Sequence, residues 1–247
     1  MVKVIKNEII SYYRCRQVRQ TSRKKLIDFG NDVVAVEDTW WHQLIKKNGW
    51  RLCMNNSYSG STISSSGYGG ADYTPRSFVT RASNLGNPDI IFVFGATNDS
   101  WVPAPIGEYK YSGWTKDDLK SFRPSLAKML DYMTKRYLGV KIYFILNSEL
   151  SDAIDSSVKN ICAHYNVPVI ELQDVEKKAG HPSIAGMKAI AEQVDAFVKK
   201  DKNTGRNAKK AFQKRVAHKK GVNKKDIKKK ELKSGKKNKR EKKSEKK

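Results

Sequence analysis

The feature that most constrains the fold is a short apolar run in the middle of the chain. Residues 89–95, with the sequence DIIFVFG, place five consecutive apolar residues between Asn87-Pro88 and a glycine. Short apolar runs that are rich in β-branched and aromatic residues, and bounded by turn residues, are typical of buried strands. Strands buried on both faces occur in parallel sheets that are covered by helices on both sides. The run therefore predicts a central strand of an α/β domain.

The rest of the chain alternates between short apolar runs and longer segments with a helical period. In residues 115–137, apolar residues recur every three or four positions after the capping-box sequence TKDD. This alternation predicts a three-layer α/β/α architecture with a parallel sheet. The expected strands are 51–55, 89–94, 141–146 and 167–172, and the expected helices are 36–47, 115–137, 152–165 and 183–199.

Positive charge is concentrated at the two ends of the chain. Of the net charge of +24, residues 199–247 carry +19 and residues 1–30 carry +6, so the segment between them is close to neutral. The lysine-rich end has too few apolar residues to form a core, and we expect it to be disordered. The predicted organisation is an atypical basic segment 1–30, an α/β domain 31–199 and a disordered tail 200–247. Such a tail attracts polyanions, including nucleic acids, without reading their sequence.

Other sequence features exclude several classes of protein. The three cysteines, Cys15, Cys53 and Cys162, are widely spaced and odd in number, which argues against a disulfide framework or a zinc site. No apolar run reaches the roughly 18 residues of a membrane-spanning helix. The N-terminus lacks a signal-peptide pattern, because arginines follow the short apolar patch Ile9-Ile10. We therefore expect a cytoplasmic protein that uses no metal or cofactor and does not associate with membranes.

Polar residues follow three of the predicted strands, in the positions where α/β sheets bind ligands. These stretches are NNSYSGS (55–61), GATND (95–99) and GHPS (180–183), and in chain order they offer a glycine, an asparagine and a histidine. A serine acyl hydrolase requires hydrogen-bond donors for a developing oxyanion and an imidazole that takes the proton of the nucleophile. The three loops therefore indicate an acyl-transfer site.

These three stretches resemble motifs of the SGNH (GDSL-type) hydrolase family, over about residues 31–198. The resemblance implies a flavodoxin-like three-layer fold and an ester hydrolase, either an acetyl or acyl esterase or a lipase-like enzyme. It implies that the substrate is a small-molecule or carbohydrate ester and that no cofactor is needed. It also implies that the Gly60 N–H and the Asn98 side chain form the oxyanion hole, with His181 as the catalytic base.

Two expected parts of that family's site are missing. The Gly-Asp-Ser motif, which supplies the nucleophile, does not occur in the sequence, so the nucleophile is unknown. Ser11 ends a poor strand candidate, but its neighbours are not those of the motif. The position three residues before His181, where the family has an aspartate, is Lys178. Asp174 and Glu176 are left as acids that could orient the imidazole.

Three hypotheses follow from this pattern. The chain is an ester hydrolase, a degenerate family member that binds esters without cleaving them, or a polyanion-binding protein that works through its tail. Because the first strand of the family is central to its sheet, residues 1–10 are expected to replace it, or the chain would be unstable. The change of composition near Gly30 also fits an N-terminus that is truncated or shifted in reading frame.

Overall fold

The computed structural model describes residues 6–13, 32–102 and 104–203. The chain forms two compact units, Met1–Ala196 and Phe197–Lys247. The first unit contains the sheet and the candidate site, and the few described residues of the second unit are helical. Most of the predicted basic segment and nearly all of the predicted tail lie outside the described residues, so the expected disorder of the tail stays a prediction.

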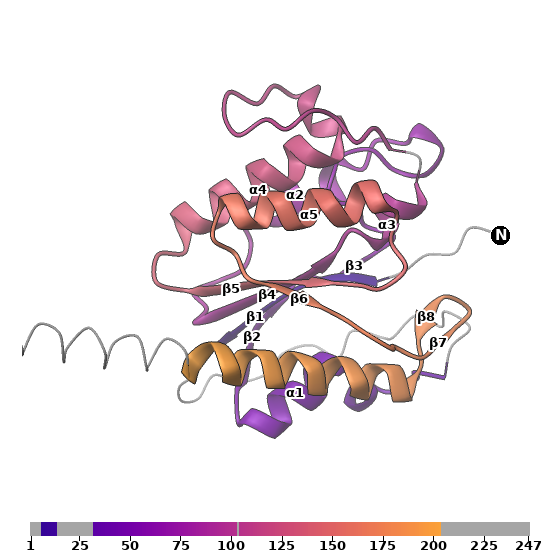
Figure 1. Ribbon diagram of the computed structural model, residues 1–247, viewed down its shortest axis with the longest axis vertical. Coiled ribbons are helices and arrows are strands. Elements are labelled where there is room, and N and C mark those ends of the chain that lie inside the picture. Colours follow the sequence, from indigo (N-terminus) through magenta and orange to yellow (C-terminus); the bar gives the residue numbers. More distant parts are fainter. Residues whose placement is uncertain (1–5, 14–31, 103, 204–247) are drawn as a thin grey trace, which may run out of the picture. The chain divides into compact units, whose positions relative to one another are not determined.

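A six-stranded sheet forms the middle of the first unit (Figure 1). Its strands are β1 (Lys6–Tyr13), β2 (Arg51–Asn55), β3 (Tyr58–Ser59), β4 (Ile90–Gly95), β5 (Lys141–Leu146) and β6 (Val169–Glu171). They lie in the order β2-β1-β4-β5-β6, and β3 pairs with β1. The apolar run that predicted a central strand is β4.

One strand runs against the direction of its neighbours. β5 pairs in parallel with both β4 and β6, whereas β1 pairs antiparallel with both β2 and β4. β2 therefore has the same direction as β4, and the predicted α/β fold with a parallel sheet is confirmed, with β1 inserted in reverse. The chain uses its N-terminal residues as a central strand, as one hypothesis required, but the reversed direction was not predicted.

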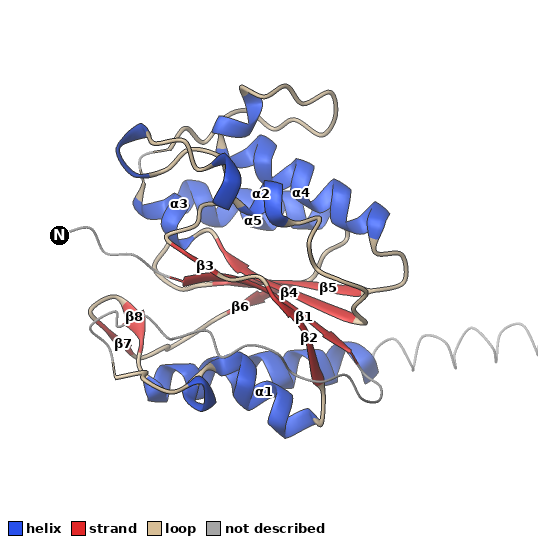
Figure 2. Cartoon of the chain, turned by 180° about the vertical axis from the view of Figure 1, so that it is seen from behind, coloured by secondary structure: helices blue, strands red, loops and turns tan. Residues whose placement is uncertain are grey.

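Helices cover both faces of this sheet (Figure 1 and Figure 2). The helices are α1 (Trp40–Asn48), α2 (Phe78–Arg81), α3 (Thr97–Trp101), α4 (Phe122–Arg136) and α5 (Asp152–His164). α2, α4 and α5 lie on one face, while α1 lies on the other face with a helix that begins at residue 184. This arrangement confirms the three-layer architecture.

β4 is buried along its whole length and contributes to the core on both faces. On one face, the Phe92 ring stacks on Tyr143 of β5 with centroids 5.4 Å apart, and the edge of Trp40 of α1 meets it at 6.1 Å. On the other face, Ile91 and Val93 belong to the apolar cluster formed with α2, α4 and α5. Because successive side chains of a strand point to opposite faces, an uninterrupted apolar run is required here.

Two predicted helices are shorter than their sequence patterns suggested. The segment 36–47 is divided at Thr39, which has extended backbone angles and separates a 3-10 turn from α1. Thr115 and Asp118 form the expected reciprocal capping bonds, at 2.6 to 3.2 Å, but these open only a 3-10 turn. The long helix, α4, starts later, at Phe122. None of the described helices is long and apolar enough to cross a membrane.

Candidate active site

The loop after β2 turns at Gly60. The φ angle of Gly60 is +67°, in the left-handed region that glycine adopts without the steric cost of a side chain. β3 precedes this glycine, and its Tyr58 pairs with Asn7 of β1. Ser61 follows it, is fully buried, and donates its hydroxyl to the Arg76 carbonyl at 2.5 Å. The position of Gly60 is thus held from both sides.

Asn98 lies in α3, directly after β4. Its side chain is fully buried, and its amide nitrogen donates to the Ser61 carbonyl at 3.0 Å. Its amide oxygen accepts from the Tyr68 hydroxyl at 3.1 Å. Ala96, two residues earlier, has a φ angle of +74°, a strained conformation that recurs at functional sites. The structure therefore brings two of the predicted site residues, Gly60 and Asn98, together.

Asp99 connects the two loops that contain Gly60 and Asn98. Its carboxylate accepts the backbone N–H groups of Ile63, at 2.8 Å, and of Ser64, at 3.2 Å. Burial removes this carboxylate from water and raises its pKa to about 6, although the hydrogen bonds from both amides lower it. Asp99 therefore fixes the spacing of the loops at the expense of a desolvated charge.

The loop after β5 adds a second buried amide to the same edge of the sheet. Asn147 follows β5 directly, and its Nδ2 donates to the hydroxyl of Thr97, the first residue of α3, at 3.3 Å. The Oδ1 of Asn147 is buried and has no hydrogen-bond partner among the described residues. α3 is thus bonded on one side to the loop after β2 and on the other to the loop after β5.

His181 lies in a short hairpin formed by β7 (Lys177–Lys178) and β8 (His181–Pro182). The imidazole is buried, and it meets the Trp101 ring edge-on with the ring centroids 6.5 Å apart. Trp101 is the last residue of α3, the helix that contains Asn98. α3 therefore contacts both the loop of Gly60 and the predicted base.

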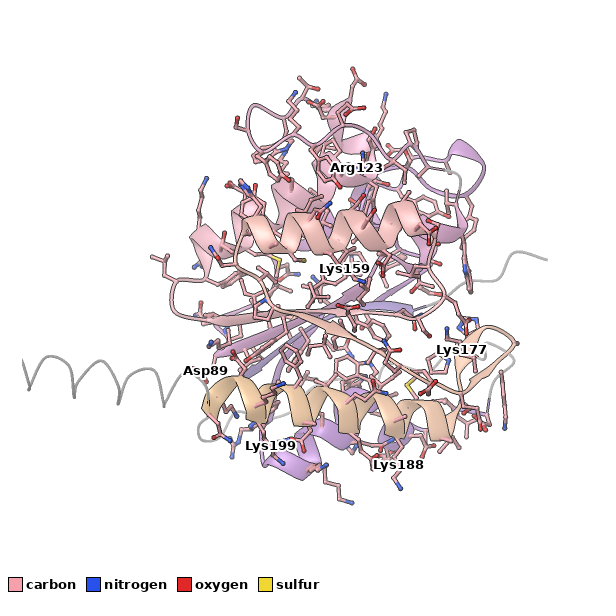
Figure 3. All side chains as sticks on the ribbon, in the orientation of Figure 1. Asp89, Arg123, Lys159, Lys177, Lys188 and Lys199 are labelled. Atoms are coloured by element: carbon pink, nitrogen blue, oxygen red, sulfur yellow. The ribbon has the colours of Figure 1, made fainter. Side chains whose placement is uncertain are left out.

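Lys177, which is labelled in Figure 3, ties this hairpin to the loop after β5. Its ammonium group donates to the carbonyl and the hydroxyl of Ser148, at 3.2 and 3.0 Å, and it pairs with Glu149 at 3.0 Å. The Lys177 side chain is 12% exposed, whereas that of Glu149 is 76% exposed, so the bonds to Ser148 are the better shielded from water. The strand preceding His181 is thus anchored to the loop after β5.

Lys178, which stands where the family resemblance places an aspartate, is paired with an acid from far away in the sequence. Its ammonium group lies 2.6 Å from the Asp32 carboxylate. The same carboxylate accepts the N–H of Ile184, in the first turn of the following helix, at 2.8 Å. The hydrogen bonds from Lys178 and then from Ile184 hold the pKa of Asp32 below its ordinary value. Asp32 therefore caps this helix and neutralises the lysine.

The turn before His181 is packed closely against the same helix. The Glu176 carboxylate accepts the Ser183 hydroxyl at 2.5 Å, and the Glu176 carbonyl accepts the Ser183 N–H at 3.0 Å. A Cβ atom on Gly186 would lie 2.1 Å from that carbonyl oxygen, so a larger residue does not fit there. Glu176 thus holds the start of the helix, while Asp174 is exposed. Neither acid is placed as the partner of His181 by these contacts, and that role stays a prediction.

The family of the chain follows from its similarity to known proteins. The family model of GDSL-like lipases and acylhydrolases matches residues 11–198. The chain belongs to the GDSL-like lipase/acylhydrolase family. The resemblance that the three motifs carried is therefore confirmed, and it assigns the chain to esterase- and lipase-type hydrolases.

Two solved structures, both assigned as GDSL-like lipases, are similar to this chain. One, from Bacteroides ovatus ATCC 8483, is 57% identical with a TM-score of 0.68, and the match covers 69% of this chain and 82% of that one. The other, from Bacteroides uniformis ATCC 8492, is 52% identical with the same TM-score and covers 69% of this chain and 80% of that one. No curated protein matches the chain. These GDSL-like neighbours agree with the fold described above.

In this GDSL-like domain, β1 occupies the central position beside β4. Because β1 is reversed, its first residues lie at the carboxyl edge of the sheet, with Glu8 opposite Phe94. Ser11 pairs with Ile91, three residues farther from that edge, which corresponds to about 10 Å along the strand. This register argues against Ser11 as the nucleophile, and β1 brings no other serine to the edge.

Several residues of the GDSL-like site were not predicted from the sequence. Asp99 had a usable signal, because it directly follows the motif asparagine at the end of a buried strand. Tyr68, Asp32 and Asn147 had none, because each reaches the site from a loop whose path depends on the whole fold. The position of Trp114 was likewise not predicted from the sequence. In the structure its indole N–H donates to the Lys110 carbonyl at 2.9 Å, and its ring packs against the core.

Proposed function

We propose that this chain hydrolyses carboxylic esters at the carboxyl edge of β4 by a serine–histidine mechanism. The supporting observation is the bond from Asn98 Nδ2 to the Ser61 carbonyl, which holds a side-chain amide beside Gly60. An ester carbonyl bound there would receive hydrogen bonds from the Gly60 N–H and from the Asn98 amide. Donors that are fixed in advance stabilise the negative charge that develops on the carbonyl oxygen, often the largest catalytic effect.

His181 is the proposed general base. It would take the proton of the attacking serine as that oxygen bonds to the ester carbon, and would then return the proton to the departing alcohol. Water would cleave the resulting acyl-enzyme by the same proton transfers in a second round. The imidazole is buried and meets Trp101 edge-on, so it lies beside the helix that contains Asn98, which supports this role. No step requires a metal or a cofactor.

The proposed substrates are small-molecule or carbohydrate esters. The family contains lipase- and acylhydrolase-type enzymes, and the partly exposed Trp101 offers an aromatic surface next to His181. Aromatic rings in such a place pack against acyl chains or sugar faces.

A second candidate function is ester binding without cleavage. It is favoured by the reversed direction of β1, which places Glu8 rather than a serine at the edge opposite Phe94. A chain of this kind would keep the oxyanion donors Gly60 and Asn98 and would lack a nucleophile in reach of them.

The lysine-rich end supports an additional proposal, that the chain binds polyanions. Residues 199–247 contain 24 lysines and arginines against 5 acidic residues. Binding of this kind falls steeply with salt, because it depends on the release of counterions. Deletion of residues after Asn203 should abolish salt-sensitive RNA or DNA binding and leave ester binding unchanged.

Covalent labelling with a fluorophosphonate probe tests hydrolysis against binding alone. Hydrolysis predicts that one serine becomes labelled, that mass spectrometry identifies it, and that labelling is lost in His181→Ala. Absence of labelling in folded protein, with retention of ester binding, would support the second candidate. Labelling that persists in His181→Ala would contradict the proposed base.

A further inference from the structure

The guanidinium group of Arg76 has aromatic contacts but no acceptor. Its Cζ lies 3.7 Å from the ring centroid of Tyr73 and 5.3 Å from that of Tyr58. Its Nε is buried, and within the described part of the chain none of its nitrogens has a hydrogen-bond acceptor or a carboxylate partner. The side chain is therefore held beside the two rings, and its buried Nε–H has no acceptor among the described residues.

Unused guanidinium donors in a partly buried position are unusual. Arginine has five N–H donors, and removing one from water without an acceptor costs free energy. A ring face attracts the positive charge, but it does not satisfy donors that point along the plane of the guanidinium. An anionic oxygen pair would satisfy them, because the planar fork of arginine matches carboxylate and sulfate geometry.

Arg81 adds a second positive charge beside the same tyrosine. Its guanidinium lies 5.9 Å from the Tyr58 centroid and donates to the Arg76 carbonyl at 2.8 Å and to the Ser61 hydroxyl at 2.8 Å. Its acceptors are neutral oxygens, and burial lowers its pKa to about 10. Asp72, the acid closest to Arg76 in sequence, is occupied by the Thr74 N–H at 2.8 Å. The charge of the two arginines is thus not balanced locally.

This pair of arginines lies next to the proposed oxyanion hole. The Arg76 carbonyl accepts the Ser61 hydroxyl, and the Ser61 carbonyl accepts the Asn98 amide. Tyr58, whose ring contacts Arg76, is two residues before Gly60 and is about half exposed, at 49%. The backbone of Arg76 is therefore linked to Asn98 through two hydrogen bonds, and its guanidinium lies beside Tyr58, on the loop that turns at Gly60.

We propose that Arg76, with the rings of Tyr58 and Tyr73, forms an anion subsite that binds a carboxylate or sulfate group of the ester substrate. Arg81 contributes charge and holds the loop, but most of its donors are already used. The preferred substrate is therefore an ester with an anionic group on its acyl or alcohol part. This inference rests on the proposed binding of esters at Gly60 and Asn98.

Binding of two matched esters tests the subsite without requiring turnover. Monomethyl succinate carries a carboxylate and a methyl ester, and methyl butyrate is its uncharged counterpart. Titration followed by NMR chemical shifts should give a lower Kd for monomethyl succinate, and Arg76→Gln should raise that Kd by about tenfold or more, the effect of losing charged hydrogen bonds. Arg76→Lys, which keeps the charge but not the fork, should fall between the two.

Arg136→Gln is the matched control. The Arg136 guanidinium also lies over a tyrosine, 5.4 Å from the Tyr137 centroid, but at the far end of α4. The control should leave the Kd of monomethyl succinate unchanged. An equal loss in Arg136→Gln would show unspecific attraction to a basic protein and would overturn the subsite. Unchanged binding in folded Arg76→Gln would overturn it as well.

A third titration separates a substrate group from a free inorganic anion. Inorganic sulfate that competes with monomethyl succinate in an Arg76-dependent way supports the subsite. If sulfate binding depends on Arg76 while monomethyl succinate does not bind, the assignment to a substrate group is overturned. Arg76-dependent ester binding without any turnover would leave the subsite standing and refute hydrolysis. Hydrolysis of both esters with no dependence on Arg76 would support hydrolysis and refute the subsite.

Discussion

The loops around Asn98 and the strand β1 beside them are built in opposite ways. The loops after β2 and β4 are bonded to each other through Asn98 and Asp99, and both side chains are almost completely buried. β1 lies between β2 and β4 but runs against both, so the edge that should carry a nucleophile carries the start of the strand. The first region has contacts that would hold the proposed oxyanion donors in place, whereas β1 brings no serine to the same edge of the sheet.

This difference shows which parts of a site can persist independently. The Asn98–Ser61 and Asp99–Ile63 bonds join the loops directly, so they do not require a serine on the neighbouring strand. A central strand, by contrast, needs only backbone partners and suitable burial, and both directions of the chain can supply these. The contacts that join the two loops therefore do not depend on the direction of β1.

The largest expected effect comes from the proposed base. We expect His181→Ala to lower the rate of ester turnover, or of fluorophosphonate labelling, by about 10²- to 10⁴-fold, because proton transfer from the nucleophile is lost. His42→Ala is the matched control, since His42 lies on α1 against Trp41. Equal losses in both variants would show that His181 acts only through folding. A rate unchanged in His181→Ala would place the reaction elsewhere.

The next effect tests the oxyanion donors. We expect Asn98→Ala to lower kcat about 10²- to 10³-fold with little change in KM, because the amide acts mainly on the charge of the transition state. Asn160→Ala, which removes an exposed amide bonded to the Tyr109 hydroxyl, should leave kcat unchanged. If kcat of Asn98→Ala stayed within twofold of the wild type, Asn98 would not be an oxyanion donor, and the comparison between these loops and β1 would lose its basis.

Asp99 gives a prediction on stability against pH. Its pKa is about 6 in the folded protein and near 3.8 when unfolded, so the folded state holds a proton that the unfolded state releases between these values. The contribution of Asp99 to stability should therefore decrease by about 2 kcal/mol as the pH rises from 4 to 7. Denaturant unfolding of the wild type and of Asp99→Asn at each pH measures this contribution, as the difference between their free energies of unfolding. If this difference grows with pH, the hydrogen bonds from the Ile63 and Ser64 amides lower the pKa of Asp99 more than desolvation raises it.

The smallest effect concerns the ion pair near the histidine hairpin. The lowered pKa of Asp32 means that its contribution to stability is present above pH 3.8 and is lost as the pH falls through its folded value. We expect Asp32→Asn to lower the thermal midpoint slightly at pH 7. At a pH below the folded pKa of Asp32, where the wild-type carboxyl is also protonated, the substitution should leave the midpoint unchanged. Asp117→Asn, which breaks an exposed pair with Lys120, should change the midpoint less, because the Asp117 side chain makes no capping hydrogen bond to the turn that follows it. A larger drop in the midpoint of the Asp117 variant would contradict the capping role of Asp32.

Much of the fold could be predicted because its signals are local. The apolar runs of β4 and β5 are continuous, and the glycine, asparagine and histidine motifs follow strand ends. The direction of β1 could not be predicted, because an apolar strand pattern is the same in both directions. The break at Thr39 and the pairing of Lys178 with Asp32 also depend on contacts between distant segments. Arg76 had no sequence signal, since its unused donors are visible only once its neighbours are placed.

The absent side chain at Gly186 sets a limit on how this protein can be altered. A Cβ there would lie 2.1 Å from the Glu176 carbonyl, so any larger residue must separate the helix from the turn that leads into His181. Random mutagenesis aimed at a new substrate should therefore recover active variants with changes at many positions of this helix and almost none at 186. Because alanine, the smallest replacement, already adds that Cβ, position 186 offers no gradual way to move the histidine.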